Sequence, residues 1–361
     1  MLEWAAPESV DTPALVVDLD TLVANIERMA SRMAARGVSL RPHTKTHKSV
    51  DIAALQVANG ALGLTAASIG EAEVLAAAGF DDLFIAYPIV AAREKARRLA
   101  RLAERTTVAV GVDSVEAGRL FVDHGLARAL SLTIEIDTGQ HRSGVPPSAA
   151  AQLAVDLSEL GLRVDGVFTH AGQSYWDPDA PDRIAKEEAA MLAEAVERMA
   201  SRGVVAHRVS AGATPTAVAS AVPPVNEERP GTYVFNDRQQ VGLGSAARAD
   251  VALAVVATVV STSVPGQAVI DAGSKALAAD HQEWLDGFGV VPELGDAKVV
   301  RMSECHGVVA LGDQPKPAIG TLVRVVPNHA CPTVNLFDHY DVVRDGTVID
   351  HWPVSARGHL A

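Results

Sequence analysis

The chain has 361 residues, of which 48% are hydrophobic and 21% charged, a composition typical of a folded protein and unlike that of a disordered one. This length predicts a barrel-sized domain and a smaller second domain. The formal net charge of −13 disfavours a general role in nucleic-acid binding, because an acidic surface repels phosphate backbones.

The sequence predicts a protein of the cytoplasm that binds no membrane. Two cysteines, Cys305 and Cys331, are too few for a disulfide framework and indicate a reducing compartment. The first residues, MLEWAAPESVD, have neither the basic region nor the apolar core of a signal peptide. The longest apolar run, at 251–260, is too short to span a bilayer and rich in β-branched residues, so we interpret it as a strand.

Short apolar runs alternate with longer amphipathic stretches over the first two thirds of the chain. The runs lie at 38–43, 61–66, 82–87, 107–112, 132–137, 164–170, 207–212 and 232–237. Between them, apolar residues recur at helical spacing, as in 146–160 and 185–200. Eight strands, each followed by a helix, predict an α/β fold of the (β/α)8 TIM barrel type. An open doubly wound sheet is the alternative, but the turn after the first run lacks the glycines of a dinucleotide-binding fold.

The remainder of the chain has a different pattern. After about residue 248, apolar runs are broken by Gly, Pro and Asp turns with few helical stretches between them, which predicts a mostly β C-terminal domain. The opening run at 14–19 also predicts a strand, and we assign it to the same domain. The expected domains are therefore a barrel over 20–248 and a β domain formed by 1–19 and 249–361.

Polar residues follow several of the predicted barrel strands. They are His43 to Lys45 after the first strand, Asp137 to Arg142 after the fifth, His170 to Tyr175 after the sixth, Gly212 to Thr214 after the seventh, and Tyr233 and Asn236 within the eighth. All are expected on the one face of the barrel where barrel enzymes hold their active sites. Their convergence predicts an active site there.

The segment RPHTKTHKS, at 41–49, contains two lysines, two histidines and an arginine. A solvated basic loop is one interpretation. However, the segment directly follows a strand in an acidic protein, and a partly desolvated lysine near other cations has a lowered pKa that suits Schiff-base chemistry. Lys45 lies nearest the strand end and is the better candidate. Lys48 is expected at the surface, where a helix starts.

Two further loops are candidates for ligand binding. The small residues of SAGATPT, at 210–216, could bind a phosphate through backbone amides, as loops after the seventh strand of a barrel commonly do; an ordinary tight turn is the alternative. Arg142 follows a glycine turn, where it could donate to a phenolic or carboxylate oxygen or merely pair with Asp137.

His329 and Cys331 lie two residues apart in the run HAC. In a strand, such residues point to the same side, so both could reach one ion, and imidazole with thiolate is a zinc-like ligand pair. A buried histidine and cysteine that merely lie side by side are the alternative. Cys305 and His306 are further possible ligands of lower weight.

Taken together, seven motifs of the chain resemble those of the D-serine dehydratase and D-threonine aldolase family, pyridoxal-phosphate (PLP) enzymes related in fold to alanine racemase. The motifs are TPALVVDLDTLVANIERMA, RPHTKTHKS, DTGQHRSGV, HAGQSY, SAGATPT, RPGTYVFNDRQQ and PNHACPT. The resemblance runs from about residue 10 to the end. It implies an alanine-racemase-like barrel (PLP fold type III) with a C-terminal β domain, in agreement with the layout above.

The resemblance also implies roles for individual residues. Lys45 would carry PLP as a Schiff base and act as the catalytic base. The other implied cofactor-binding residues are Arg142 at the phenolic oxygen, His170 and Tyr175 beside the ring and substrate, and Gly212, Ala213, Thr214 and Tyr233 at the phosphate. The partner molecule would be a D-amino acid substrate, and the implied assembly is a homodimer.

His329 and Cys331 match the metal pair of the family. The His-x-Cys pattern resembles the dehydratase branch, with zinc, whereas the aldolase branch usually has His-x-Asp and harder metals, so manganese is the alternative. The chain departs from the family at Cys305, because relatives often have Glu-His-Gly where Cys-His-Gly stands here, and whether Glu304 replaces that glutamate stays open.

The resemblance implies a metal-dependent PLP lyase acting on D-3-hydroxy amino acids. We favour a dehydratase that yields a 2-oxo acid and ammonia. The first alternative is an aldolase that cleaves the Cα–Cβ bond to glycine and an aldehyde. An amino-acid racemase and a non-catalytic PLP carrier are less favoured, because neither explains both the metal pair and the β domain.

Overall fold

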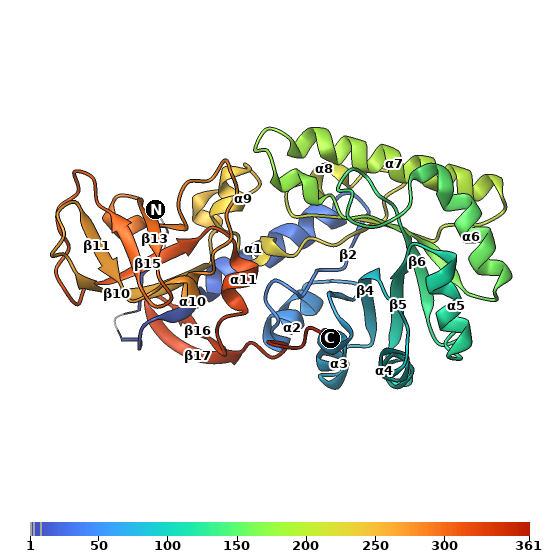
Figure 1. The fold of residues 1–361 in the computed structure, drawn as a ribbon, viewed down its shortest axis with the longest axis horizontal. Coiled ribbons are helices and arrows are strands. Elements are labelled where there is room, and N and C mark those ends of the chain that lie inside the picture. Colours follow the sequence, from blue (N-terminus) through green and yellow to red (C-terminus); the bar gives the residue numbers. More distant parts are fainter. Residues whose placement is uncertain (1, 3, 8) are drawn as a thin grey trace. The chain divides into compact units, whose positions relative to one another are not determined.

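The computed structural model describes residues 2, 4–7 and 9–361. They form two compact units, in which segments far apart in the sequence pack together (Figure 1). The barrel unit comprises Met29–Lys45, Ile52–Gly231 and Gly358–Ala361, and the sheet unit comprises Met1–Arg28, Thr46–Asp51 and Thr232–Arg357. The domain boundaries expected from the sequence stay a prediction.

The barrel unit contains a parallel sheet of eight strands in the order β2-β9-β8-β7-β6-β5-β4-β3. The strands are β2 (Ser39–Leu40), β3 (Leu64–Ala66), β4 (Asp82–Pro88), β5 (Thr107–Val112), β6 (Ser131–Glu135), β7 (Val164–Phe168), β8 (Arg208–Ala211) and β9 (Glu227–Glu228). An isolated parallel bridge between His43 and Thr65 joins the end of β2 to β3, the two outer strands of that order. The predicted α/β fold with a TIM-like parallel sheet is confirmed.

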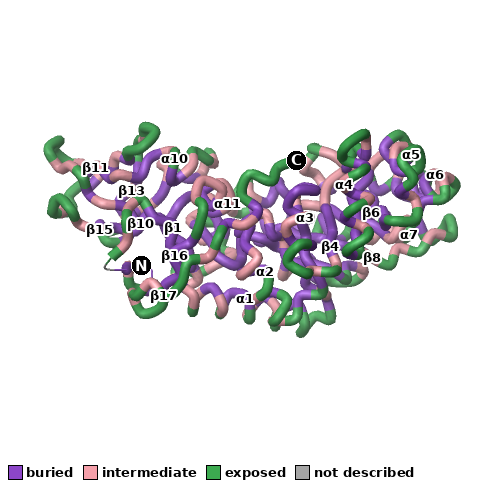
Figure 2. The backbone as a smooth tube through the Cα atoms, turned by 90° about the horizontal axis from the view of Figure 1, so that it is seen from below, coloured by how far each residue is buried: buried purple, intermediate pink, exposed green. Residues whose placement is uncertain are grey.

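Helices alternate with these strands, as the sequence pattern predicts (Figure 1). The longer ones are α3 (Ile69–Ala77), α4 (Glu94–Ala103), α5 (Val115–Asp123), α6 (Ala150–Glu159) and α7 (Pro181–Ser201). Ser68 and Ser114 cap the N-termini of α3 and α5. Each serine hydroxyl accepts a hydrogen bond from a backbone amide of the first turn, that of Glu71 at 3.0 Å and that of Ala117 at 3.3 Å. Apolar faces of these helices pack with the strands in one core, in which β6 is buried along its whole length (Figure 2).

One predicted strand is wrong. The run at 232–237 contains a 3-10 turn, Thr232–Val234, and the eighth strand of the parallel sheet is the acidic pair Glu227–Glu228. This pair lies between β2 and β8, since Ser39 and Ser210 both stand opposite Glu227. The run at 232–237 is apolar because Val234 and Phe235 are fully buried, and a buried turn has the same composition as a buried strand.

The sheet unit holds nine strands in the order β11-β14-β13-β12-β15-β10-β1-β16-β17. Their bounds are β1 (Ala14–Asp18), β10 (Leu253–Ser261), β11 (Gln267–Ile270), β12 (Gly289–Val291), β13 (Ala297–Met302), β14 (Gly307–Ala310), β15 (Leu322–Pro327), β16 (His339–Arg344) and β17 (Thr347–Pro353). Most neighbours are antiparallel, and β1 lies between β10 and β16. The predicted mostly β C-terminal part is thus confirmed, with a strand from the start of the chain inside it.

Further helices complete the chain. They are α1 (Leu19–Ala34), α2 (Val50–Ala58), α8 (Ala217–Ser220), α9 (Arg238–Gly242), α10 (Ser274–Leu277) and α11 (Ala330–Val334). In the described part of the chain, none of the helices has the length and apolar character needed to cross a membrane.

Candidate active site

A cavity of about 180 Å³ opens in the barrel unit at the carboxyl ends of the parallel strands. Four of the predicted site residues line it, namely Lys45, Arg142, His170 and Gly212. These residues follow β2, β6, β7 and β8. The cavity therefore occupies the face on which barrel enzymes carry their active sites.

Lys45 is half-buried in a turn that both neighbouring strands hold in place. The amide of His43 donates to the carbonyl of Pro230 at 3.0 Å, and the amide of Thr44 donates to the carbonyl of Thr65 at 2.8 Å. Lys48 was predicted at the surface, and that prediction is wrong: it is 7% exposed, with a backbone φ of +50°. The segment is therefore an integral part of the fold and not a solvated basic loop.

His170 holds a neutral ring beside Lys45. Burial, followed by the positive charge of Lys45, lowers the pKa of His170 from 6.5 to about 3. Its Nδ1 lies 3.0 Å from the carbonyl oxygen of Gly212, which can only accept a hydrogen bond. In the neutral ring Nδ1 therefore carries the proton, and Nε2 is an acceptor.

Only glycine fits at position 212. Its φ is +133°, and an added Cβ would lie 2.6 Å from the amide nitrogen of Arg229 and 3.0 Å from Oε2 of Glu228. The amide of Gly212 donates to Oε1 of Glu188 at 3.2 Å, so this donor points away from any ligand. Ala213 and Thr214 are buried next to it. Phosphate binding by the loop would therefore depend on groups other than the Gly212 amide.

Two carboxyl groups are buried behind this loop. Glu188 and Glu228 are both fully buried, and each has one oxygen, Oε2, without a hydrogen-bond partner in the described structure. Burial, and for Glu228 also the neighbouring Glu188, raises the pKa of both groups. A proton on one of them lets the pair remain close without two adjacent charges.

Arg142 is half-exposed, and the carboxylate nearest to its guanidinium is that of Glu135 and not that of Asp137, the partner considered from the sequence. Its Nη2 lies 3.5 Å from Oε1 of Glu135, whereas Asp137 pairs with Nδ1 of His141 at 2.8 Å. The long distance to Glu135 leaves the guanidinium able to donate to a ligand in the cavity.

Arg229 also lines the cavity, and the sequence analysis missed it. It is 4% exposed, donates to the carbonyl of Thr169 at 2.5 Å, and also donates to the hydroxyl of Ser210. Its guanidinium carbon lies 5.4 Å from the centre of the Phe168 ring. The signal was its place at the head of the motif RPGTYVFNDRQQ, of which only the run at 232–237 was interpreted, as a strand. His43, expected on this face of the barrel, also lines the cavity, and so does Tyr87, which was not predicted.

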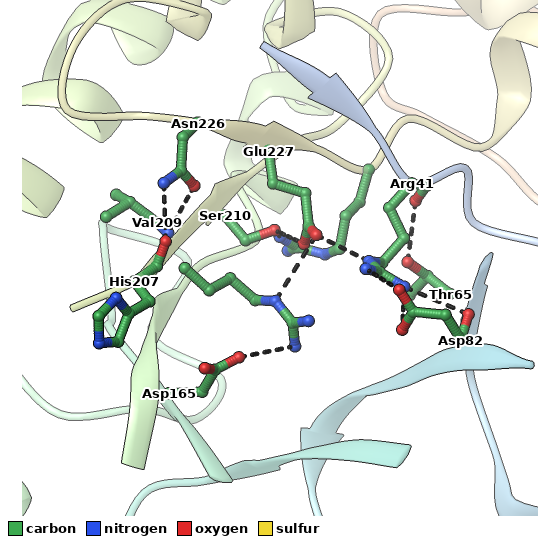
Figure 3. A network of polar contacts seen from close by, with 11 residues as sticks. Arg41, Thr65, Asp82, Asp165, His207, Val209, Ser210, Asn226 and Glu227 are labelled. Atoms are coloured by element: carbon green, nitrogen blue, oxygen red, sulfur yellow. Dashed lines mark hydrogen bonds and ion pairs between the residues drawn. The ribbon is translucent and has the colours of Figure 1, made fainter. Parts of the chain in front are cut away.

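A network of charged side chains lies in the interior of the barrel (Figure 3). Glu227 accepts from Nε of Arg41 at 2.7 Å and from the hydroxyl of Ser210 at 2.5 Å. Arg41 in turn donates through both terminal nitrogens to Asp82, each at 2.8 Å. Ser210 therefore links the network to Arg229 and the cavity.

The two predicted tyrosines lie in different units. Tyr175 ends a 3-10 turn, Gly172–Tyr175, and is half-buried in the barrel unit. Tyr233 is 3% exposed in the 3-10 turn Thr232–Val234 of the sheet unit. The role of Tyr233 beside a phosphate stays a prediction.

The predicted metal pair lies at the start of α11 in the sheet unit. His329 precedes this helix and Cys331 is in its first turn, so the predicted strand geometry is wrong. Burial disfavours a charged His329, but Cys331 and then Asp280 outweigh it and raise the pKa of the imidazole. Nδ1 of His329 lies 2.8 Å from Oδ2 of Asp280, and Thr46 Oγ1 lies 3.2 Å from the sulfur of Cys331. His329 and Cys331 are thus close together, with a carboxylate that orients the ring.

The other candidate ligands are elsewhere on the sheet unit. Cys305 and His306 are both exposed. Glu304, considered as a replacement for the glutamate of the family, pairs with Lys275 at 2.5 Å. Within the described residues, the one group of three possible ligands with mutually close atoms consists of His339, Asp341 and His351.

Comparison with known proteins identifies the family. The alanine racemase N-terminal domain matches residues 17–239, and a D-serine dehydratase-like domain matches residues 252–343. D-threo-3-hydroxyaspartate dehydratase of Delftia sp. is 38% identical over 94% of this chain and 96% of its own length. D-serine dehydratase of Dictyostelium discoideum is 30% identical over 95% of this chain and 98% of its own.

Comparison with solved structures identifies the same family. D-threonine aldolase of Filomicrobium marinum has a TM-score of 0.88 at 33% identity, covering 99% of this chain and 98% of its own. Alanine racemase of Clostridium difficile, at 12% identity and a TM-score of 0.69 over 96% of this chain and 100% of its own, shares the fold. The chain therefore belongs to the D-serine dehydratase and D-threonine aldolase family, whose fold is that of alanine racemase.

Proposed function

We propose that this protein is a PLP-dependent lyase acting on D-3-hydroxy amino acids. The single observation that carries the proposal is the half-buried amine of Lys45 in a cavity at the carboxyl end of the barrel strands. The relatives support the substrate class, because serine, threonine and 3-hydroxyaspartate all carry a hydroxyl on Cβ.

The residues around the cavity fit the cofactor. Lys45 and Arg142 line the same cavity, and Arg142 is able to donate to an anionic oxygen there. When bound, PLP supplies an electron-accepting ring that stabilises negative charge on the substrate Cα. Lys45 would hold the cofactor aldehyde and then accept the proton from Cα.

The residues that surround this amine would keep it in position. The His43 and Thr44 amides fix the turn to both neighbouring strands, so the amine has a defined place in the cavity. His170 contributes a neutral ring that adds no positive charge beside Lys45.

His329 and Cys331 would hold a divalent metal, and an imidazole with a thiolate favours zinc over manganese. The hydrogen bond between Nδ1 of His329 and Asp280 leaves Nε2 as the ligand atom. A metal held there supplies Lewis acidity suited to a hydroxyl leaving group. This pair supports the dehydratase reaction over retro-aldol cleavage.

The test is to incubate the protein with PLP, zinc and either D-serine or D-threonine. A dehydratase releases pyruvate or 2-oxobutyrate with ammonia, and an aldolase releases glycine with an aldehyde. The matched controls are Lys45→Ala, expected to be inactive, and Lys95→Ala on the exposed face of α4, expected to be active. Glycine as the only product would reverse the preference for dehydration, and the lack of any turnover would overturn the proposal.

We also propose a cytoplasmic homodimer, supported by the absence of a disulfide framework among the two cysteines and by the family resemblance. Light scattering at micromolar concentration would test the assembly, and a monomeric mass would contradict it.

A further inference from the structure

The sheet unit carries a second cluster of metal-ligating side chains on the hairpin β16–β17. Asp341 stands directly opposite His351 in the antiparallel register. His339 precedes Asp341 by two residues on β16, and residues two apart in a strand point to the same face. The backbone pairing therefore places all three side chains on one face of the hairpin.

The ligand atoms of the three residues are close enough to share an ion. They all lie within 4.8 Å of one another. Nδ1 of His351 is 2.7 Å and Nε2 of His339 is 3.6 Å from the same oxygen, Oδ1 of Asp341. The two imidazole rings meet edge to face, at 79° with centres 5.6 Å apart. Both rings thus direct nitrogen atoms toward the carboxylate and do not stack on each other.

The carboxylate is buried while the entrance to the cluster is open. Asp341 is only 7% exposed, whereas the side chains of His339 and His351 are 57% and 64% exposed. In the described part of the chain, these two histidines are the only basic groups that pair with Asp341. A buried carboxylate is costly without a cation, and a metal ion held between it and the two imidazoles would neutralise its charge.

The cluster also faces a cavity of about 660 Å³ within the sheet unit. Asp11, from the segment before β1, lies in the same wall and adds negative charge. The cavity has space for the waters that would complete the coordination of an ion.

We propose that His339, Asp341 and His351 bind a divalent first-row transition metal, zinc foremost, at a site separate from His329 and Cys331. Two imidazole nitrogens and one carboxylate oxygen are ligands typical of zinc, nickel or copper and atypical of magnesium or calcium, which prefer oxygen alone. The ion links β17, the edge strand of the nine-stranded sheet, to β16 through side chains. It therefore stabilises the hairpin by binding the folded state alone.

The experiment counts bound zinc. The PLP-loaded protein is stripped with a chelator, mixed with a small excess of zinc, desalted and analysed by inductively coupled plasma mass spectrometry. We expect two zinc ions per chain in the wild type, one in His351→Ala or His339→Ala, and one in His329→Ala. His124→Ala, at an exposed histidine outside either cluster, is the matched control and should bind two.

Calorimetric titration then measures the affinity of the hairpin site in the His329→Ala background. Loss of a direct ligand should weaken zinc binding by more than about 100-fold, because loss of an outer partner alone costs about 10- to 100-fold. His339→Ala and His351→Ala should also abolish the rise in Tm on adding zinc in that background.

The outcomes separate this proposal from the proposed function. Zinc content that is unchanged in both His339→Ala and His351→Ala would overturn the hairpin site, whatever the enzymatic activity. If the wild type binds a single zinc ion, and this ion is retained in His329→Ala but lost in His351→Ala, the result would support the hairpin site and count against the pair at α11. Both hairpin histidines are exposed, so these variants should fold, and unchanged circular dichroism would verify it.

Discussion

Two buried regions, one in each unit, hold different kinds of side chain. In the barrel unit, Arg41, Glu227 and Arg229 are each at most 4% exposed and are held by partners of opposite charge or by hydroxyl and carbonyl groups. In the sheet unit, the first five residues of β10, from Leu253 to Ala257, are all apolar and fully buried. Matched charges therefore hold this part of the barrel interior, and apolar burial holds β10.

This difference corresponds to what each interior supports. Apolar burial stabilises a sheet without specifying the direction of any polar group. A buried charge requires a partner in a fixed geometry. A series of hydrogen bonds runs from Asp82 through Arg41, Glu227 and Ser210 to Arg229, which lines the candidate active site. The charged interior thus contributes to the position of a cavity residue, which an apolar core could not do.

The largest expected effect comes from Lys45→Ala in the barrel unit. Activity should fall by at least about 10²- to 10⁴-fold, the contribution of a positioned acid or base, and the visible absorbance of the bound cofactor should disappear. Cys331→Ala in the sheet unit should instead keep this absorbance and lose one zinc ion per chain. Absorbance spectra and metal analysis of both variants test whether Lys45 holds the cofactor and Cys331 the metal. An unchanged cofactor band in Lys45→Ala would refute this assignment.

Next in size is the loss of a buried charge. Arg41→Ala leaves Asp82 and Glu227 without their main partner, so the free energy of unfolding should fall by about 3–5 kcal/mol. Arg98→Ala is the control: Arg98 binds Glu73 through two hydrogen bonds of 2.9 and 2.7 Å, but both side chains are partly exposed. Its removal should cost at most about 1 kcal/mol. Equal costs in urea unfolding would show that burial of the network does not matter.

The buried part of β10 should respond to lost volume, because its side chains are apolar. Leu253→Ala at a fully buried position of β10 should lower the free energy of unfolding by about 2–5 kcal/mol through lost burial and a residual cavity. Val260→Ala, on the same strand but 39% exposed, should cost about 0.5 kcal/mol or less. Urea unfolding of both variants measures the contrast, and a similar loss in each would mean that β10 is not in the core.

The last effect depends on pH and is absent at neutral pH. The pKa of His170 is about 3 in the folded protein against 6.5 for a free ring, so the unfolded chain binds a proton first as the pH falls. The wild type should therefore lose stability between about pH 6.5 and pH 3, and His170→Gln should lose less over the same range. Unfolding curves at pH 7, 5 and 4 test this. An equal loss of unfolding free energy in the wild type and in His170→Gln would indicate that the imidazole of His170 is solvated in the folded protein.

The sequence predicted the fold well where strands are continuous apolar runs. The runs at 82–87 and 107–112 match β4 and β5 within one residue, because strands of a parallel sheet are buried on both faces. The run at 232–237 misled, and Glu227–Glu228 could not be recognised as a strand. Their acidic side chains are buried against partners from other segments: Arg41 donates to Glu227, and the hydroxyl of Ser220 donates to Glu228.

The candidate site was predicted in part for a similar reason. Motifs identified Lys45 and its neighbours, since these are local and carry distinctive residue types. Arg229 depends on its contacts with Thr169 and Ser210, which come from other strands and leave no periodic signal. The pair at 329 and 331 was located by residue type, but the turn into α11 replaces the strand on which the geometric argument depended.

The attachment of β2 to its neighbours has a consequence for motion. The Arg41 side chain is anchored to Asp82 and Glu227, and its amide donates to the carbonyl of Glu228 at 2.9 Å. The turn bearing Lys45 begins three residues later. Backbone amides of this stretch should exchange with deuterium only in large unfolding events. The Lys45 amine is therefore held by a rigid segment, and movements that admit a ligand have to occur in other segments.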